Sequence, residues 1–323
     1  MTGRWAKRVL ENGISRRDFL KATGTAAVMA AAGITGCVGA DQTGPTLSPT
    51  IRPTVSPVKG DMVVAVDPDP ITLVDRALDA FGGLSGIISP GDRVVMKANY
   101  SFAKSVKDAT CNHPDVLVRI MQHCKDAGAK EVVVIDNTLD NPTLCLERSG
   151  IQAALDKAGF KAVSPKNKNT EYTEKDMNGS KIKKVHLANV LLEADTFINI
   201  PVIKSHNMST MTASMKNLMG VIYDRGVFHY GLDVNIAELA GFIRPDLNIA
   251  DAYRVMKTGG PRGTSSSIIS YPNTLIVGKD PVAVDSYSAS LLDLKGGDIG
   301  HIKAAYDMGL GEYDLSKVDI IRV

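Results

Sequence analysis

The sequence predicts an α/β fold in which helices flank a largely parallel sheet, built as one unit or as two lobes around a cleft at the strand ends. Short runs of β-branched apolar residues alternate with amphipathic segments from Asp61 onward. The strand-like runs are nearly continuous in apolar residues, which is typical of strands covered on both faces. Strands that alternate with helices in this way form βαβ units, and such units place the strands in parallel.

The individual elements follow from the same patterns. Pro114 comes directly after His113, and Gly128 follows the last apolar position, which are typical start and stop signals of a helix. Asp280 before Pro281 predicts an N-cap with proline at the first helical position. The predicted strands are residues 62–66, 93–99, 131–137, 195–204, 246–253, 274–278 and 318–323. The predicted helices are residues 71–83, 113–129, 143–160 (one helix or a pair), 233–243, 280–294 and 298–309.

An export leader is predicted over residues 1–36. The stretch SRRDFLK at residues 15–21 places twin arginines before a weakly apolar run that is too short to span a membrane as a stable helix. The run ends in ITGC, which resembles a bacterial lipobox with Cys37 as the lipidated residue. A plain twin-arginine signal, cut near the AAA stretch with Cys37 incidental, is the alternative. Acyl chains on Cys37 would give stable attachment to a membrane.

Residues 37–60 are predicted to form a tether between that anchor and the α/β domain at residues 61–323. The stretch from residue 40 to residue 60 has no hydrophobic period and carries four prolines among threonines and serines. We therefore expect a protein that the twin-arginine translocon exports. It would be anchored through Cys37 to the outer face of the cytoplasmic membrane or to a periplasmic membrane surface.

The charge balance argues against nucleic-acid partners. The whole chain has a formal net charge of +2, but residues 1–36 contribute +4, which leaves −2 for the remainder. Affinity for nucleic acids depends mainly on neutralising phosphates, and a nearly neutral body lacks that footprint.

The cysteines limit the cofactors. After Cys37 the chain has Cys111, Cys124 and Cys145, an odd number without C-x-x-C spacing, so at most one disulfide can form among them. An iron–sulfur cluster held by this chain alone would usually need four thiolates, so the cysteine count argues against one. The sequence is compatible with a bound metal ion and identifies no other cofactor. Cys111 is a candidate thiolate or metal ligand before the helix at 113–129, with a helix cap at Asn112 as the alternative.

Polar side chains gather where the predicted strands end, which is where α/β folds bind ligands. Lys97 and Asn99 lie two residues apart at the end of one strand, and Lys204 and His206 repeat this spacing at the end of another. Residues two apart on a strand share a face. A lysine is costly in a core unless it is paired, so the alternative is a solvent-facing strand exit.

A helix-like segment follows His206. Its methionines, at positions 208, 211, 215 and 219, have spacings typical of a buried helical stripe, and core packing explains them better than a soft-metal site. Lys216 lies at the margin of that stripe, next to Asn217. Together with Lys204 it could hold a carboxylate, a phosphate or a deprotonated cofactor group.

Further candidates are one loop arginine and several aspartates. Asp136 ends the strand VVVID and could orient a cation or a hydroxyl, or form a turn or cap instead. Arg262 lies in the glycine-rich stretch 257–267, which could cradle an anion but also fits a mobile surface loop. Asp251 and Asp285 are the candidate metal ligands. The sequence has no G-x-S-x-G, no H-E-x-x-H and no paired-carboxylate motif that would indicate a hydrolase.

These motifs resemble the domain-of-unknown-function 362 family over nearly all of residues 61–310. The stretches VVMKAN, INIPVIKSHNMSTMTASMKNLMGVI, LNIADAYRVMKTGGPRG and NTLIVGKDPVAVDSYSASLL carry the resemblance. It implies a fold and a set of site positions, without a settled activity. Ala98 stands where the family usually has proline, and the ferredoxin-like cysteines of some members are missing. The implied site positions are Lys97, Asn99, Lys204, His206, Lys216, Asn217, Asp251, Asp280 and Asp285.

Three functions are compatible with this site. In the first, the protein is an enzyme or carries a cofactor: His206 acts in acid–base chemistry or binds a metal, the lysines position an anion, and the aspartates bind a metal or orient the lysines. In the second, a lipid-anchored receptor captures an anionic solute without catalysis. In the third, the lysines and aspartates form a structural ion-pair network.

Overall fold

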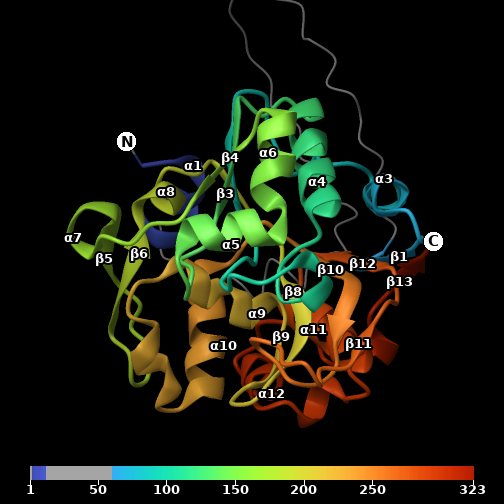
Figure 1. Ribbon diagram of the computed structural model, residues 1–323. Coiled ribbons are helices and arrows are strands. Elements are labelled where there is room, and N and C mark those ends of the chain that lie inside the picture. The colour runs from blue at the N-terminus through green and yellow to red at the C-terminus, as the bar shows by residue number, and fades with distance from the viewer. Residues whose placement is uncertain (1, 12–59) are drawn as a thin grey trace, which may run out of the picture.

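The computed structural model describes residues 2–11 and 60–323, and its centre is a mixed, mostly parallel sheet between two layers of helices (Figure 1). The α/β fold predicted from the sequence is therefore confirmed. Within the main path only β12 runs against its two neighbours. The strand order is β13 (Ile320–Arg322), β1 (Met62–Val66), β12 (Thr274–Gly278), β10 (Leu247–Met256), β7 (Thr196–Asn199), β2 (Arg93–Lys97), β3 (Glu131–Ile135) and β4 (Lys161–Val163).

Each face of the sheet packs on its own group of helices because side chains alternate along every strand. In β2, Val94 and Met96 join one core cluster, whereas Val95 joins the other. The first cluster is covered by α3 (Pro70–Phe81), α4 (Pro114–Asp126), α5 (Pro142–Ser149) and α6 (Ile151–Ala158). The second is covered by α9 (Ser214–Asn217), α10 (Leu232–Ile243), α11 (Pro281–Ser290) and α12 (Gly300–Asp307). Lys97 has the parity of Val95 and so points to the second layer.

Several helices start as the sequence indicates, with a capping side chain followed by proline. The Asp69 carboxylate accepts the Thr72 N–H at 2.8 Å at the start of α3. Asp280 accepts the backbone N–H groups of Val282 and Ala283 at the start of α11. Proline at the first helical position loses no intrahelical hydrogen bond. The cap of α4 is His113, however, and not Asn112.

The predicted strand 195–204 is two strands in the structure. β7 ends at Asn199, and β8 (Val202–His206) begins after Pro201, which has no N–H to donate to a ladder. β7 pairs with β2 and β10, whereas β8 pairs with a later part of β10 and with β9 (Thr210–Thr212). Because Asn199 at the end of β7 lies opposite Lys97 at the end of β2, the residues of β8, including Lys204 and His206, lie past the end of β2.

The helix predicted over the methionine stripe is wrong in its first half. Residues 210–212 form β9, which pairs with β8 so that Thr212 lies opposite Lys204. Met208 is 56% exposed, whereas Met215 is fully buried. The helix α9 begins only at Ser214, where the Asp285 carboxylate accepts the first backbone N–H groups. The hairpin competes successfully with helical propensity because β8 offers it a free edge.

The remaining elements are short, and apolar periodicity does not reveal them. β5 (Tyr172–Asp176) reads YTEKD and pairs with β6 (Lys184–Ala188) in a separate two-stranded sheet. Charged side chains on an exposed hairpin leave little pattern in the sequence. The others are α7 (Lys168–Glu171), α8 (Asn189–Leu192), β11 (Ile269–Ser270), η2 (Val106–Asp108), η3 (Leu218–Val221), η4 (Arg225–His229), η5 (Gly296–Asp298) and η6 (Leu315–Lys317).

The start of the chain packs against the body. α1 (Arg4–Ala6) and η1 (Lys7–Glu11) lie beside α8 and contact β7 and α10, so this part of the predicted leader belongs to the fold (Figure 1). The twin arginines Arg16 and Arg17, Cys37 and the tether up to residue 59 lie outside the described residues. In the described ranges, no helix is both long enough and apolar enough to cross a bilayer.

Candidate functional site

A cavity of about 140 Å³ opens at the carboxyl ends of β2, β3 and β8, and seven of the residues predicted from the sequence line it. They come from parts of the chain more than 100 residues apart, because strand ends and the start of α9 meet there. The seven are Lys97, Asn99, Asp136, Lys204, His206, Lys216 and Asn217.

Lys97 and Asp136 form a buried ion pair at the base of the cavity. The Lys97 ammonium lies 3.1 Å from the Asp136 carboxylate, and both side chains are almost fully buried. The second carboxylate oxygen accepts the Tyr100 N–H at 3.0 Å and the Ser101 hydroxyl at 2.8 Å. Burial lowers the pKa of Lys97, and Asp136 opposes that effect. This pair is electrically neutral as a unit.

Gly220 leaves room for this pair. A Cβ at position 220 would overlap the Lys97 side chain and the Asp136 carboxylate. The backbone of η3 therefore lies directly on the ion pair, and only glycine fits between them.

Lys204 is buried and has no carboxylate partner among the residues that the structure describes. Its ammonium donates to the Asn99 Oδ1 at 3.0 Å and to the Thr110 carbonyl at 2.8 Å. It also lies 5.4 Å from the centre of the Phe102 ring. Burial, with a smaller contribution from the cations Lys97 and Lys216, lowers its pKa to about 7, although Cys111 and Asp136 oppose the shift. Lys204 is thus half-protonated near neutral pH.

His206 is oriented by the turn that follows it. Its Nδ1 accepts the backbone N–H groups of Met208 at 3.1 Å and Ser209 at 3.2 Å. These bonds assign the ring proton to Nε2, because a nitrogen that accepts carries no proton. Burial lowers the pKa of His206 to about 3, and Lys216 and Lys204 add to the shift. The ring is therefore a neutral hydrogen-bond donor at physiological pH and a poor base.

Lys216 and Arg225 are two further cations in this wall. The Lys216 ammonium donates to the Met219 sulfur at 3.5 Å. Burial lowers its pKa to about 8, and Arg225 adds to the shift. The Arg225 guanidinium donates to the Thr138 carbonyl at 3.4 Å. In the described residues neither cation, nor Lys204, has a carboxylate within ion-pair distance.

A row of amides positions the lysines. Lys204 donates to Asn99 Oδ1, and Asn99 Nδ2 donates to Asn217 Oδ1 at 3.1 Å. Asn217 Nδ2 donates to Asn199 Oδ1 at 2.9 Å, and Asn199 Nδ2 donates to Asn248 Oδ1 at 2.9 Å. Lys97 also donates to Asn217 Oδ1, at 2.9 Å. Asn99 and Asn217, predicted as ligand-binding residues, therefore use their amides to hold the lysines.

Arg262, predicted to bind the ligand, does not line the cavity. It makes a two-pronged ion pair with Asp140, with both N–O distances 2.9 Å, and lies 4.8 Å from the centre of the Phe102 ring. Its neighbour Pro261 does line the cavity. The glycine-rich loop is held against β8 by a hydrogen bond of 3.1 Å from the Gly260 N–H to the Ser205 hydroxyl. This arginine therefore fixes the loop at the mouth of the cavity.

The aspartates predicted as metal ligands also lie away from the lining. Asp251 accepts from Asn112 Nδ2 at 3.1 Å and from the His113 N–H at 2.8 Å. Asp285 caps α9, and burial raises its pKa to about 6 while His301 opposes the shift. Within residues 2–11 and 60–323, no three His, Cys, Asp or Glu side chains are grouped so that they could hold a metal ion.

The three described cysteines are buried thiols rather than disulfides. Burial raises the pKa of Cys111 to about 11, although Arg254 and Lys204 oppose the shift. Cys111 is therefore a thiol at neutral pH, which argues against a nucleophilic role.

Sequence reasoning missed Arg225, His229 and Phe102. The first two lie in η4, where the stretch DRGVFHYG has no period that would mark it as a strand or helix. A basic residue and a histidine between two tyrosines in a loop after the candidate helix were the available signal. Phe102 follows the end of β2 and reads as an ordinary apolar residue.

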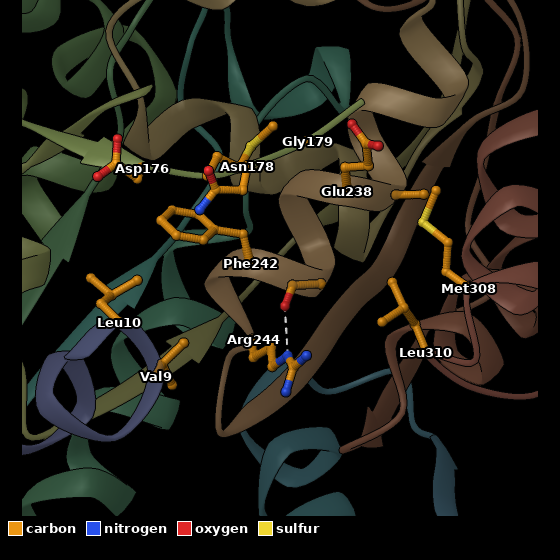
Figure 2. A pocket seen from close by; sticks show the side chains of 13 residues that line it. Val9, Leu10, Asp176, Asn178, Gly179, Glu238, Phe242, Arg244, Met308 and Leu310 are labelled. Atoms are coloured by element: carbon orange, nitrogen blue, oxygen red, sulfur yellow. Dashed lines mark hydrogen bonds between the residues drawn. The ribbon is translucent and has the colours of Figure 1, made fainter. Parts of the chain in front are cut away.

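A second cavity, of about 370 Å³, lies elsewhere, between the leading segment, α10 and the chain that follows α12 (Figure 2). Val9 and Leu10 face Phe242 there, and Met308 and Leu310 close the opposite side (Figure 2). It contains none of the residues that the sequence singles out.

Comparison with known proteins identifies the family. A family model described as "Domain of unknown function (DUF362)" matches residues 94–290. The chain belongs to the DUF362 family. The match includes every residue that lines the strand-end cavity and excludes the leading segment.

A DUF362 relative is the "Thylakoid-associated protein sll1697" of Synechocystis sp., which is 25% identical over 242 residues, 72% of this chain and 73% of that protein. Two solved structures share 11% and 9% of the sequence. They are the lactate racemase apoprotein of Thermoanaerobacterium thermosaccharolyticum (TM-score 0.41, 67% of this chain) and a Thermotoga maritima protein (TM-score 0.44, 75% of this chain). This chain spans 55% and 60% of their lengths.

Proposed function

We propose that this DUF362 protein binds a small oxyanion, a carboxylate or phosphate group, in the strand-end cavity. The observation that carries the proposal is the charge of the wall. Lys204, Lys216 and Arg225 face it without a carboxylate partner among the described residues, and the one carboxylate, Asp136, is already used by Lys97. Holding several unpaired cations at partly or fully buried positions is costly, and an anionic ligand would relieve that cost.

The contacts of each side chain indicate how much it would contribute to binding the anion. Among the described residues the Lys216 ammonium donates only to the Met219 sulfur, so an oxyanion would be its first strong acceptor. The Nε2–H of His206 can donate a further hydrogen bond, since Nδ1 is occupied by backbone donors. Lys97 contributes little net charge because Asp136 neutralises it. A cavity of about 140 Å³ accommodates a small acid or a single phosphate group rather than a nucleotide.

The test is calorimetric titration of the full-length protein with inorganic phosphate and, separately, with acetate at pH 6.5. Lys216→Met keeps the length of the side chain and removes the charge, so we expect the affinity to fall by about tenfold or more. The matched control is Lys157→Met, at an exposed position of α6, which should bind as the parent does. Equal affinity of the parent and Lys216→Met would overturn the proposal. A response to only one of the two anions would identify its chemical class.

The environment of Lys204 favours a second function for the same site, in which the bound anion is a substrate and Lys204 transfers a proton. Its two recorded hydrogen bonds go to Asn99 and Thr110, so a neutral amine there would keep its lone pair free of these contacts. With a pKa of about 7, such a lysine can give or take a proton at neutral pH. The alternative is a receptor that only captures the anion.

Proton exchange separates the two. With pyruvate as the probe in D₂O, a catalytic lysine should speed exchange of the methyl hydrogens, and Lys204→Met should abolish that gain. His206→Ala should lower turnover more than binding if the ring assists the chemistry. Pyruvate that binds without any exchange above the buffer rate would favour the receptor.

We also propose that the protein is exported and anchored by lipid on Cys37. The support is the SRRDFLK and ITGC pattern of residues 15–37. Cells fed labelled palmitate should incorporate label into the parent, and Cys37→Ser should lose both the label and the membrane association. A labelled Cys37→Ser protein in the membrane fraction would refute the assignment of the lipid to this cysteine.

A further inference from the structure

The leading segment, residues 3–10, lies in a groove of the folded body. The Gly3 N–H donates to the Leu192 carbonyl at 2.8 Å, and the Trp5 N–H donates to the Ala194 carbonyl at 3.0 Å. The Trp5 side chain is fully buried, with its ring edge-on to Phe197 at 5.3 Å. Its indole N–H donates to the Arg244 carbonyl at 3.2 Å. The segment is therefore held through both its backbone and its largest side chain.

Charged contacts add to this. Arg4 pairs with Asp92, which is largely buried, and the Arg4 backbone N–H donates to the Asp195 carboxylate at 2.9 Å. Arg8 pairs with Asp246. Each acid lies between 88 and 238 residues further along the chain. The groove therefore exists only when α8, β7 and the loop before β10 have assembled.

The fit at Gly3 is close. A Cβ at this position would overlap the Glu193 and Ala194 carbonyl oxygens. Beyond Trp5 the fit is looser, because Val9 and Leu10 border the cavity of about 370 Å³ (Figure 2). The binding contacts therefore concentrate in residues 3–8.

We propose that this groove is a peptide-binding site whose ligand is the chain's own leading segment, and that the segment stays bound as a separate peptide when the chain is cut between residues 11 and 60. The recorded hydrogen bonds and ion pairs of residues 3–8 to the body all go to positions 92 and beyond, so none depends on the covalent connection. A cut at the predicted lipidation site would then leave Trp5 on the body. Release of the leader and opening of the groove are separate events.

The test uses the full-length chain with a protease recognition sequence inserted between residues 40 and 56. Trp5 is the only tryptophan of the protein, so its emission reports the groove alone. After the cut we expect native mass spectrometry to show peptide and body as one complex, with emission as blue as before the cut. Free peptide and a red-shifted emission at micromolar protein would overturn the proposal.

A matched pair of variants tests the site itself. Gly3→Val places a branched side chain against the Glu193 and Ala194 carbonyls, and we expect the cut peptide to dissociate at least about tenfold more readily. Thr2→Val is exposed and should behave as the parent. Circular dichroism of the intact chains checks that both variants fold. Gly3→Val peptide that stays bound as tightly as the parent peptide would show that this groove is not the site.

Discussion

Replacing Lys216 by methionine should stabilise the protein, although the same change should weaken anion binding. Within the described part of the chain the Lys216 ammonium has no oxygen partner, and it lies beside Arg225 in a wall of like charge. Its pKa falls from 10.5 to about 8 on folding. Since one pKa unit corresponds to about 1.4 kcal/mol, keeping this lysine charged costs the folded state ~3 kcal/mol. Methionine is similar in length and loses only a contact to sulfur.

The effect has a pH dependence with a definite sign. At pH 6 the folded and unfolded parent both hold the proton on Lys216, so the whole cost is present and the variant should be more stable by ~3 kcal/mol. As pH rises past about 8, the folded parent loses this proton while the unfolded chain keeps it until about 10.5. The parent therefore gains stability, and the advantage of the variant should vanish by about pH 10.5.

The assay is urea unfolding of full-length parent and Lys216→Met at pH 6 and pH 9.5 in chloride buffer free of phosphate and sulfate. Lys157→Met serves as the control for removing an exposed lysine, with an expected change within about 0.5 kcal/mol. A variant less stable than the parent at pH 6, or an advantage that grows with pH, would refute the reasoning that Lys216 is a destabilising cation kept for a ligand.

Three further results are expected. Sulfate, whose charge is constant over this pH range, should bind about tenfold to a hundredfold more weakly at pH 9 than at pH 6.5, because Lys204 and Lys216 lose their protons near pH 7 and pH 8. An affinity that calorimetry shows to be independent of pH would contradict this. Gly220→Ala should destabilise the protein by about 2–4 kcal/mol in urea unfolding, because the added methyl group displaces the ion pair of Lys97 and Asp136. Gly226→Ala, with open space around its Cβ, should change the stability little, and equal effects of the two substitutions would exclude the steric explanation. In a Cys37→Ser protein the three buried thiols should react with a thiol reagent only on unfolding, and fast reaction of the native protein would argue against their burial.

Much of the fold could be predicted because long apolar strands and capped helices leave strong local patterns. The runs at β1 and β12 have the bounds that the sequence indicates, and Asp280 with Pro281 marks the start of α11. Elements whose stability comes from distant partners were missed. β9 is a strand only because β8 lies beside it, and β5 carries charge instead of a period.

The candidate site followed from a different rule. Burying an unpaired lysine costs free energy, so lysines at strand ends indicate a site more than a core. Parallel strands bring their carboxyl ends together, so Lys97, Lys204 and His206 could be grouped from the sequence alone. The roles of the aspartates could not be separated in this way. Asp136 faces a lysine, while Asp285 caps a helix, and a sequence shows only that both are acidic. The docking of Trp5 had no signal at all, because its partners lie almost 200 residues away or more.

The row of asparagines explains how the protein keeps lysines inside without cancelling their charge. Every hydrogen bond from Lys204 through Asn99, Asn217, Asn199 and Asn248 runs in one direction, and each oxygen faces back toward the ammonium. Amides arranged head to tail solvate a cation with dipoles, as water would, and leave its net charge intact. An aspartate in place of Asn99 or Asn217, whose oxygens accept from Lys204 and Lys97, would form an ion pair with that lysine and remove charge that a ligand could neutralise. The buried amides thus act as a fixed, oriented solvent for the lysines and preserve a positive electrostatic potential at the carboxyl ends of the strands.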